Sequence, residues 1–418
     1  MMRHDAAQSG VVWCGVRNGG NIVSTESDVL LGLEEEVFIT EPTLPSLASL
    51  WYLARLLWSR PSYYYTHSAS NFARGKDVRQ AVMSGVEVST GIHANPERLV
   101  EDLAARRAEL ARVSDGLLVA IGHLFDLDAP SNTCGLHMHV GPVEEADLER
   151  VYSNLAHFLP LLSLLAASSP LRAGRYYGQS YRMACSYAIG PLCKSDKRFR
   201  FQDMIVSKRL GTIELRIFDP VWDLERVRVL AACIQAIART KRRLSWDEAT
   251  YAQEREVAAT RGYAGTLRLR YAELCDILGG GARGGTAGVR EDLFARTASD
   301  ELYECWKRHG TVVTYAALDG AYRHGIFDAE GAATFAASSA SATATAAAIA
   351  TAAEAGALAV TTPVGALIPH DTGRSMPGAG WRSRAARRAL GAARGALGLT
   401  CYYVPKLPYI IMKGLKEQ

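Results

Sequence analysis

The segment Leu33-Glu34-Glu35-Glu36-Val37-Phe38-Ile39 sets acidic residues among apolar ones in a short run. In a β-strand, successive side chains point to opposite faces, so one face would carry Leu33, Glu35, Val37 and Ile39. The other face would carry Glu34, Glu36 and Phe38. The segment therefore predicts a strand with a largely apolar face and an acidic face.

Three further segments repeat this alternation, at 85–89, 134–140 and 212–218. Each has an apolar face and an opposite face with ionisable groups, as expected of an antiparallel sheet with one core face and one polar face. The ionisable residues are Glu87 in the first segment, His137 and His139 in the second, and Glu214 and Arg216 in the third.

The residue types on the polar face indicate chemistry rather than solvation. A solvated face is usually rich in Lys, Thr, Ser and Gln, whereas clustered carboxylates repel one another and need cations between them. The set contains oxygen donors and imidazole but no cysteine, which suits Mg²⁺ or Mn²⁺ better than structural zinc. We expect metal ligands at Glu34, Glu36, Glu87, His137 and Glu214.

Such metals commonly hold nucleotide phosphates, and Arg216 shares its strand face with Glu214. A planar guanidinium there is placed to neutralise a transferring phosphoryl group. The chain has no G-x-x-x-x-G-K-[ST] motif, so a P-loop is excluded.

Composition limits the class of protein. The 418 residues are 48% hydrophobic and 22% charged, which is typical of a globular chain. A formal net charge of +4 is too small to indicate nucleic-acid binding over the whole molecule. The eight cysteines form no C-x-x-C pair, and no apolar run follows the start, so we expect reduced thiols and a cytoplasmic location.

The remaining chain predicts helices and two less regular regions. Asn95-Pro96 is typical of a helix start, followed by apolar residues from Leu99 to Leu117 at helical spacing. Further helices are expected over 146–167, interrupted by Pro160, and over 224–244, ending in the basic run 241–243. Residues 1–26 are expected to be irregular. The alanine-rich stretch 332–360 is too polar to cross a membrane, and an arginine-rich tail follows 373.

Several motifs resemble the carboxylate–amine ligases related to type 2 glutamate–cysteine ligase. They are the Gly32–Glu36 run, the Gly135–Gly141 strand and the Thr212–Arg216 strand, together with Ser168-Ser169-Pro170 and Ser180-Tyr181-Arg182. The resemblance covers roughly residues 31–238. It implies an α+β, glutamine synthetase-like fold, in which a curved antiparallel sheet flanked by helices holds ATP and divalent metals.

The same resemblance implies roles for individual residues. Glu34, Glu36, Glu87, His137 and Glu214 would bind metal, and His139 would join the nucleotide site. Arg216 would contact the phosphoryl group. Arg182 matches a basic position near the active site, and Arg216, His137 and Arg182 would form the catalytic set.

The leading hypothesis is an ATP-dependent ligase that joins a small-molecule carboxylate to an amine through an acyl phosphate. Two alternatives stay open: a metal-dependent hydrolase that uses His137 and His139, and a catalytically silent binding protein of the same fold. We expect a catalytic domain over 28–330 and a separate segment over 331–418. A homo-oligomer, and an acidic partner for the basic tail, are also open.

Overall fold

The computed structural model describes residues 29–40, 43–44, 64–66, 86–114, 116–128, 133–185, 202–207, 211–279 and 289–337. The expected irregular start, the arginine-rich tail and most of the alanine-rich stretch lie outside these residues. The partners proposed for the tail, and the limits of a separate segment over 331–418, therefore stay predictions.

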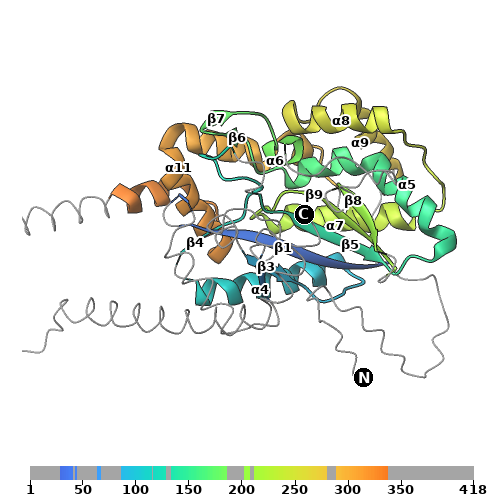
Figure 1. Ribbon diagram of the computed structural model, residues 1–418, viewed down its shortest axis with the longest axis horizontal. Helices are drawn as coiled ribbons and strands as arrows, with labels where there is room; N and C mark the ends of the chain where they lie inside the picture. The colour runs from blue at the N-terminus through green and yellow to red at the C-terminus, as the bar shows by residue number, and fades with distance from the viewer. Residues whose placement is uncertain are drawn as a thin grey trace, which may run out of the picture.

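An antiparallel sheet forms the centre of the fold (Figure 1). Its hydrogen-bonded order is β2-β3-β1-β5-β9-β8, and the short strand β4 also pairs with β1. Strand bounds are β1 Leu30–Thr40, β2 Tyr64–Thr66, β3 Val86–Ser89, β4 Leu117–Val119, β5 Leu136–Gly141, β8 Met204–Ser207 and β9 Thr212–Phe218. The hairpin β6 Leu171–Arg172 and β7 Arg175–Tyr176 forms a separate two-stranded sheet.

All four predicted strands are present, and their alternation is confirmed. The strand predicted over 212–218 has the bounds of β9, and the other three differ from β1, β3 and β5 by up to three residues at an end. Apolar residues of the core face, such as Leu33, Met138 and Leu215, are fully buried. The alternation of apolar and ionisable residues and the length of each segment therefore predicted these strands correctly.

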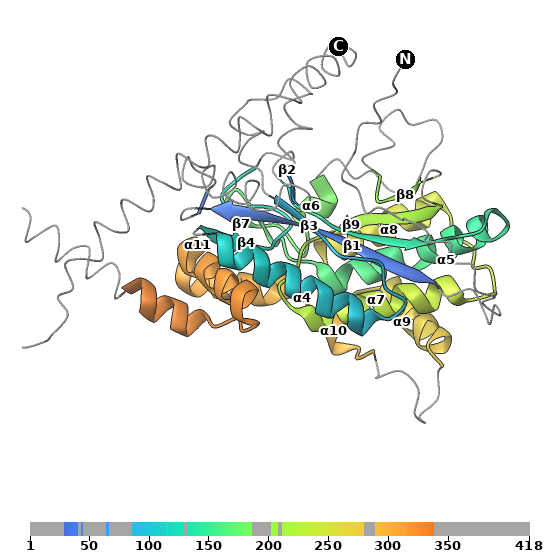
Figure 2. The same cartoon turned by 90° about the horizontal axis from the view of Figure 1, so that it is seen from below.

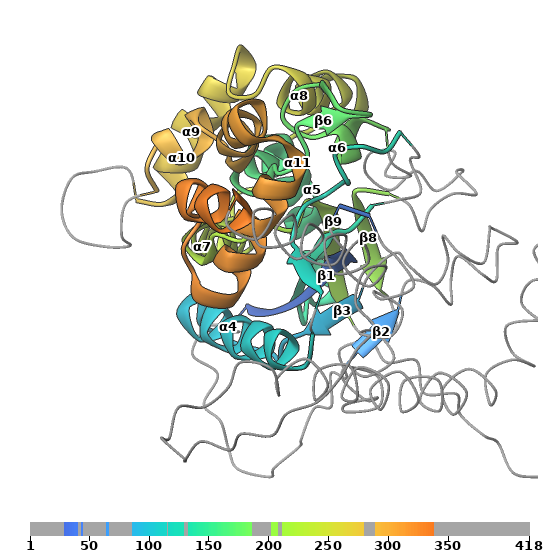
Figure 3. The same ribbon diagram turned by 90° about the vertical axis from the view of Figure 1, so that its left-hand side faces the viewer.

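Helices flank the sheet. Their bounds are α4 Pro96–Val113, α5 Glu145–Leu162, α6 Tyr181–Cys185, α7 Leu224–Arg239, α8 Glu248–Thr260, α9 Thr266–Ile277, α10 Asp292–Ala295 and α11 Ala298–His324, with a 3₁₀ turn, η1, over Ser163–Ala166. Figures 2 and 3 show α4, α7 and α11 on the same side of the sheet. The predicted α+β class, an antiparallel sheet flanked by helices, is confirmed.

The start of α4 is the one that the sequence predicts. Asn95 accepts hydrogen bonds from the backbone N–H groups of Glu97 and Arg98, and Pro96 occupies the first helical position. The end differs from the prediction, since α4 stops at Val113 and Leu117 opens β4. An apolar residue near a helix end fits either element, which is why periodicity alone extended the helix too far.

The C-terminal ends of α5 and α7 also could not be placed from the sequence alone. Pro160 lies inside α5, and the 3₁₀ turn η1 begins three residues later, at Ser163, so the helix predicted over 146–167 is divided shortly after the proline. Helix α7 ends at Arg239 rather than in the basic run 241–243, because Thr240 turns to extended backbone and caps the helix. Beyond the helix end, the carbonyls of Thr240 and Arg242 accept hydrogen bonds from the side-chain amide of Asn154.

No helix among the residues that the structure describes is both long and apolar enough to cross a membrane.

Candidate active site

The ionisable residues predicted from the four strands lie in one row on the face of the sheet opposite α4 and α7. Strand register sets their neighbours: Glu36 lies opposite Glu87, and Glu34 lies opposite His137. His139 lies opposite Glu214 on the next strand. Directly opposed residues have Cβ atoms about 5 Å apart, so the register alone brings these groups into contact distance.

His137 lies between three carboxylates. Its Nδ1 is 3.6 Å from Oε2 of Glu34 and 3.8 Å from Oε1 of Glu214, and its Nε2 is 3.9 Å from Oε1 of Glu36. These distances exceed those of ordinary N–H···O hydrogen bonds. Nδ1 of His137 and both ring nitrogens of His139 are buried, and none of them has a hydrogen-bond partner among the residues that the structure describes.

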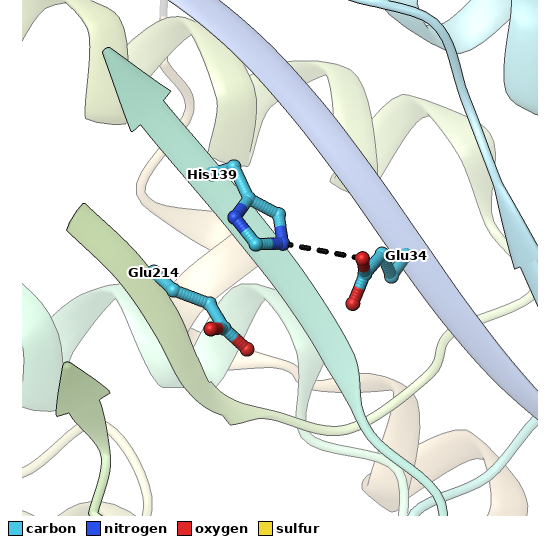
Figure 4. A group of neighbouring side chains, drawn as sticks. All are labelled: Glu34, His139 and Glu214. Atoms are coloured by element: carbon cyan, nitrogen blue, oxygen red, sulfur yellow. Dashed lines mark ion pairs between the residues drawn. The ribbon is translucent and has the colours of Figure 1, made fainter. Parts of the chain in front are cut away.

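Glu34, His139 and Glu214 form a group of candidate metal ligands (Figure 4). One donor atom from each lies within 4.8 Å of the others. Nε2 of His139 is 3.5 Å from Oε1 of Glu34. Metal–ligand distances near 2.1 Å place neighbouring donors about 3–4 Å apart, so this group fits a divalent cation after small adjustments. His139, predicted to bind the nucleotide, is thus also placed to bind metal.

The electrostatics of the row show opposing effects. Burial would raise the pKa of Glu34, but the imidazoles of His137 and His139 lower it below its usual range. Burial, reinforced by the charges of Glu34 and Glu36, raises the pKa of Glu87 well above its usual value. The carboxylates therefore repel one another in a buried place, which a divalent cation would relieve.

The pKa values of the two histidines shift in opposite directions. Burial and the charge of Arg216 lower the pKa of His137, which favours a neutral imidazole. For His139, burial also lowers the pKa, but Glu34 outweighs it and the net shift is upward. A neutral imidazole is the form that binds metal.

Arg216 is at the more accessible edge of the row. Its side chain is 28% exposed, and Nη1 donates to Oε1 of Glu214. Its backbone N–H donates to the carbonyl of Asp203, at 2.7 Å. Burial would lower the pKa of Arg216, but Glu214, Glu36 and Glu34 raise it, so it stays charged. A fixed cation beside a carboxylate cluster can bind a phosphate that approaches the same face.

Arg182 of α6 lies beneath the end of β9. Its guanidinium donates to the carbonyls of Arg216, Ile217 and Phe218 at 2.9–3.0 Å, and Nη1 is 3.7 Å from Oδ1 of Asp219. These contacts hold β9 in place. The predicted contact of Arg182 with the nucleotide stays a prediction. Nε of its guanidinium makes no hydrogen bond with the part of the chain that the structure describes.

The sequence did not indicate that position 135 has no room for a side chain. A Cβ at this position would lie 2.7 Å from Nε2 of His137 and closer still to Nη2 of Arg182. The backbone N–H of Gly135 also donates to Oε2 of Glu36, at 2.6 Å. Its place directly before the H-x-H strand was the available signal.

Sequence reasoning also left the partner of Glu35 unassigned. This carboxylate is fully buried on the helix side of β1 and pairs with Arg107 of α4. Alternation places Glu35 on the apolar face, and a carboxylate buried there needs a cation beside it. Alternation does not show which residue of the chain supplies that cation.

The chain is similar in sequence to several bacterial proteins that carry the name "Putative glutamate--cysteine ligase 2". The one from Azoarcus sp. (strain BH72) is 28% identical, over 44% of this chain and 64% of the relative. The one from Ectopseudomonas mendocina (strain ymp) is 31% identical, over 37% of this chain and 45% of the relative. The chain is a distant homologue of these ligases. The match spans about half to two thirds of the relatives' length.

No family model matches the chain. Among solved structures, the glutamate–cysteine ligase of Francisella tularensis, crystallised with AMP, superposes with a TM-score of 0.48. It is 11% identical, and the superposition covers 76% of this chain and 94% of that one. The homology to glutamate–cysteine ligase 2 proteins agrees with the resemblance inferred from the strand motifs.

Proposed function

We propose that this protein is an ATP-dependent ligase that joins a carboxylate to an amine. The observation that carries the proposal is the row of four glutamates, two histidines and one arginine on a single sheet face. The distant homology to glutamate–cysteine ligase 2 proteins supports the same reaction class. A carboxylate is a poor acylating agent, and transfer of the γ-phosphoryl group of ATP would convert it to an acyl phosphate that an amine can attack.

The row fits divalent cations. Buried imidazole nitrogens that make no hydrogen bond with the described residues lie beside clustered carboxylates, and together they form a donor set that suits a divalent cation. Glu34, His139 and Glu214 would hold one ion, and Glu36, Glu87 and His137 would supply further donors beside it. When bound, Mg²⁺ or Mn²⁺ would neutralise phosphate charge during transfer.

Arg216 would bind the transferring phosphoryl group. Its guanidinium donates to Glu214, and its backbone N–H donates to the carbonyl of Asp203, so the residue is oriented before the nucleotide arrives. A donor whose position is fixed in advance stabilises developing charge without reorganisation. Arg182 would support it through the carbonyl of Arg216, and its own contact with the nucleotide is part of the proposal.

The substrates are proposed only by class. The relatives are named for glutamate and cysteine, so this pair is the first to test, followed by other amino-acid carboxylates and amines.

The test is ADP release with Mg²⁺, ATP and pairs from an amino-acid panel, with mass spectrometry of the product. A new amide product that forms with ADP in equal amounts would support the ligase. Thermal stabilisation by Zn²⁺ alone, without any effect of Mg-ATP, would support the hydrolase that uses His137 and His139. Stabilisation by Mg-ATP without turnover on any pair would indicate a silent binding protein.

A further inference from the structure

Three consecutive glutamates, Glu34 to Glu36, lie on β1, and alternation sends the middle one away from the proposed metal site. Glu35 is fully buried on the helix side of the sheet. An isolated buried carboxylate is costly, so this position requires a compensating cation.

Arg107 of α4 is that cation. Its Nε and Nη2 donate to the two oxygens of Glu35 at 3.0 and 2.5 Å, forming a bidentate pair. Nη1 and Nη2 also donate to the carbonyls of Trp222 and Val221, both at 2.7 Å. On the other side, the hydroxyl of Tyr322 donates to Glu35 at 3.2 Å, and the guanidinium lies over the Tyr322 ring at 5.0 Å.

This arrangement distinguishes one register of β1 from its neighbours. A slip of one residue would turn Glu34 and Glu36 into the core and Glu35 out of it. A slip of two residues would keep the faces but place Leu33 or Val37 against Arg107, leaving a buried guanidinium without its carboxylate. In a slip of one residue, Glu34 or Glu36 would take the place of Glu35 against Arg107, but the other carboxylate would be buried without a cation. Only the observed register pairs Arg107 with a carboxylate and buries no second one.

The same guanidinium links two parts of the metal site. Val221 and Trp222 follow β9, the strand that carries Glu214, while Glu35 lies between the two β1 residues that face the site. Arg107 therefore fixes β1 relative to the segment that leaves β9, and with it the spacing between Glu34 and Glu214.

We propose that Arg107 is a positioning residue for the metal site, acting through Glu35 to hold Glu34 and Glu36 in register with the other ligands. This inference rests on the proposed function, because it assumes that the polar face binds a divalent cation. Residues that orient metal ligands without touching the metal typically change its affinity 10- to 100-fold.

The experiment measures Mn²⁺ binding by electron paramagnetic resonance, together with thermal unfolding, on the full chain. One variant, Glu35→Leu with Arg107→Met, replaces the buried pair by apolar side chains of similar volume, which often preserves folding. The second, Arg107→Lys, keeps a positive charge but loses the bidentate fork. We expect Mn²⁺ affinity to fall at least about tenfold in whichever variant is folded.

Glu254→Gln is the matched control. Glu254 is a buried carboxylate of α8 that accepts from Nε of Arg270 on α9, at 3.1 and 3.2 Å, and it has no part in β1. This variant should lose stability and keep its Mn²⁺ affinity. If wild-type protein binds Mn²⁺ and a folded Arg107 variant binds it within twofold of wild type, the positioning role is wrong. If wild-type protein does not bind Mn²⁺, the metal site itself is wrong and the inference fails with it.

Discussion

Gly135→Ala tests the packing of the candidate site most specifically. Gly135 is not among the residues with positive φ, so glycine is needed there for space rather than for backbone conformation. The added Cβ would lie 2.7 Å from Nε2 of His137, where ordinary contacts begin at 3.4 Å. It would be closer still to Nη2 of Arg182, so both side chains must move by most of an ångström.

The expected magnitude follows from the contacts that are lost. Nη2 of Arg182 donates to the carbonyl of Arg216 at 3.0 Å, and a shift of about 1 Å would break that bond. A hydrogen bond from a charged group contributes about 1.5–3 kcal/mol. Replacing glycine by alanine returns roughly 0.4–1 kcal/mol through the unfolded state. We therefore expect a net loss of roughly 0.5–2.5 kcal/mol.

The variant should also lose Mn²⁺ affinity. Ligands must be held within about 0.5 Å of the productive geometry, and His137 would be displaced by more than that. We expect at least a tenfold weaker affinity, in the range of changes to residues around metal ligands. Urea unfolding gives the stability, and a Mn²⁺ titration followed by paramagnetic resonance gives the affinity.

Gly320→Ala provides the control, since the nearest atom to its added Cβ is 4.0 Å away and Gly320 lies within α11. It should stabilise the protein by about 0.5–1 kcal/mol and leave Mn²⁺ binding unchanged. A Gly135→Ala protein that is as stable as wild type and binds Mn²⁺ equally well would refute the packing described here.

Three further predictions concern single side chains. Glu36→Gln keeps the size of the side chain but removes its charge, and should abolish Mg²⁺-dependent ATP turnover while circular dichroism stays that of wild type; unchanged turnover would exclude Glu36 as a ligand. Arg216→Lys should bind Mg-ATP nearly normally but lose roughly 10²–10³ in single-turnover ADP release, as expected when a fixed donor is removed; a rate close to wild type would mean that Arg216 is only the ion-pair partner of Glu214. For Asp102, burial would raise the pKa, but His93 and the backbone N–H of Gly91 outweigh burial and lower it. The ionised carboxylate therefore stabilises the folded protein above pH 3.8, and this contribution is lost as the pH falls through the lower pKa of the folded state. Asp102→Asn should therefore lose less than about 1 kcal/mol near neutral pH, and the difference from wild type should shrink below pH 4; a difference that does not depend on pH would contradict this.

The sheet was predictable from sequence because its signals are local. Four segments alternate with period two, and each ionisable residue of the polar face follows from that alternation alone. The start of α4 was equally local, since Asn95 and Pro96 are sufficient to define it. The ends of α4 and α7 were not, because capping by Ser114 and Thr240 decides them rather than apolar periodicity.

The parts of the site that could not be predicted depend on contacts between residues far apart in the sequence. Glu35 and Arg107 are 72 residues apart, and nothing near either residue indicates the other. The sequence places Arg182 near the active site but does not show that its guanidinium donates to the carbonyls of β9, and its contact with the nucleotide stays a prediction. The requirement at Gly135 arises only when α6 and β5 are packed together.

The measurement that tests the central claim most directly is transfer of ¹⁸O from a labelled carboxylate substrate to inorganic phosphate. It would use an ¹⁸O-carboxylate amino-acid panel that includes glutamate, with an amine panel, ATP and Mg²⁺, and Glu36→Gln as the inactive control. A ligase that works through an acyl phosphate predicts one ¹⁸O in the phosphate for each amide formed, and none with Glu36→Gln. Phosphate that is released in step with ADP but carries no ¹⁸O would contradict the proposed reaction.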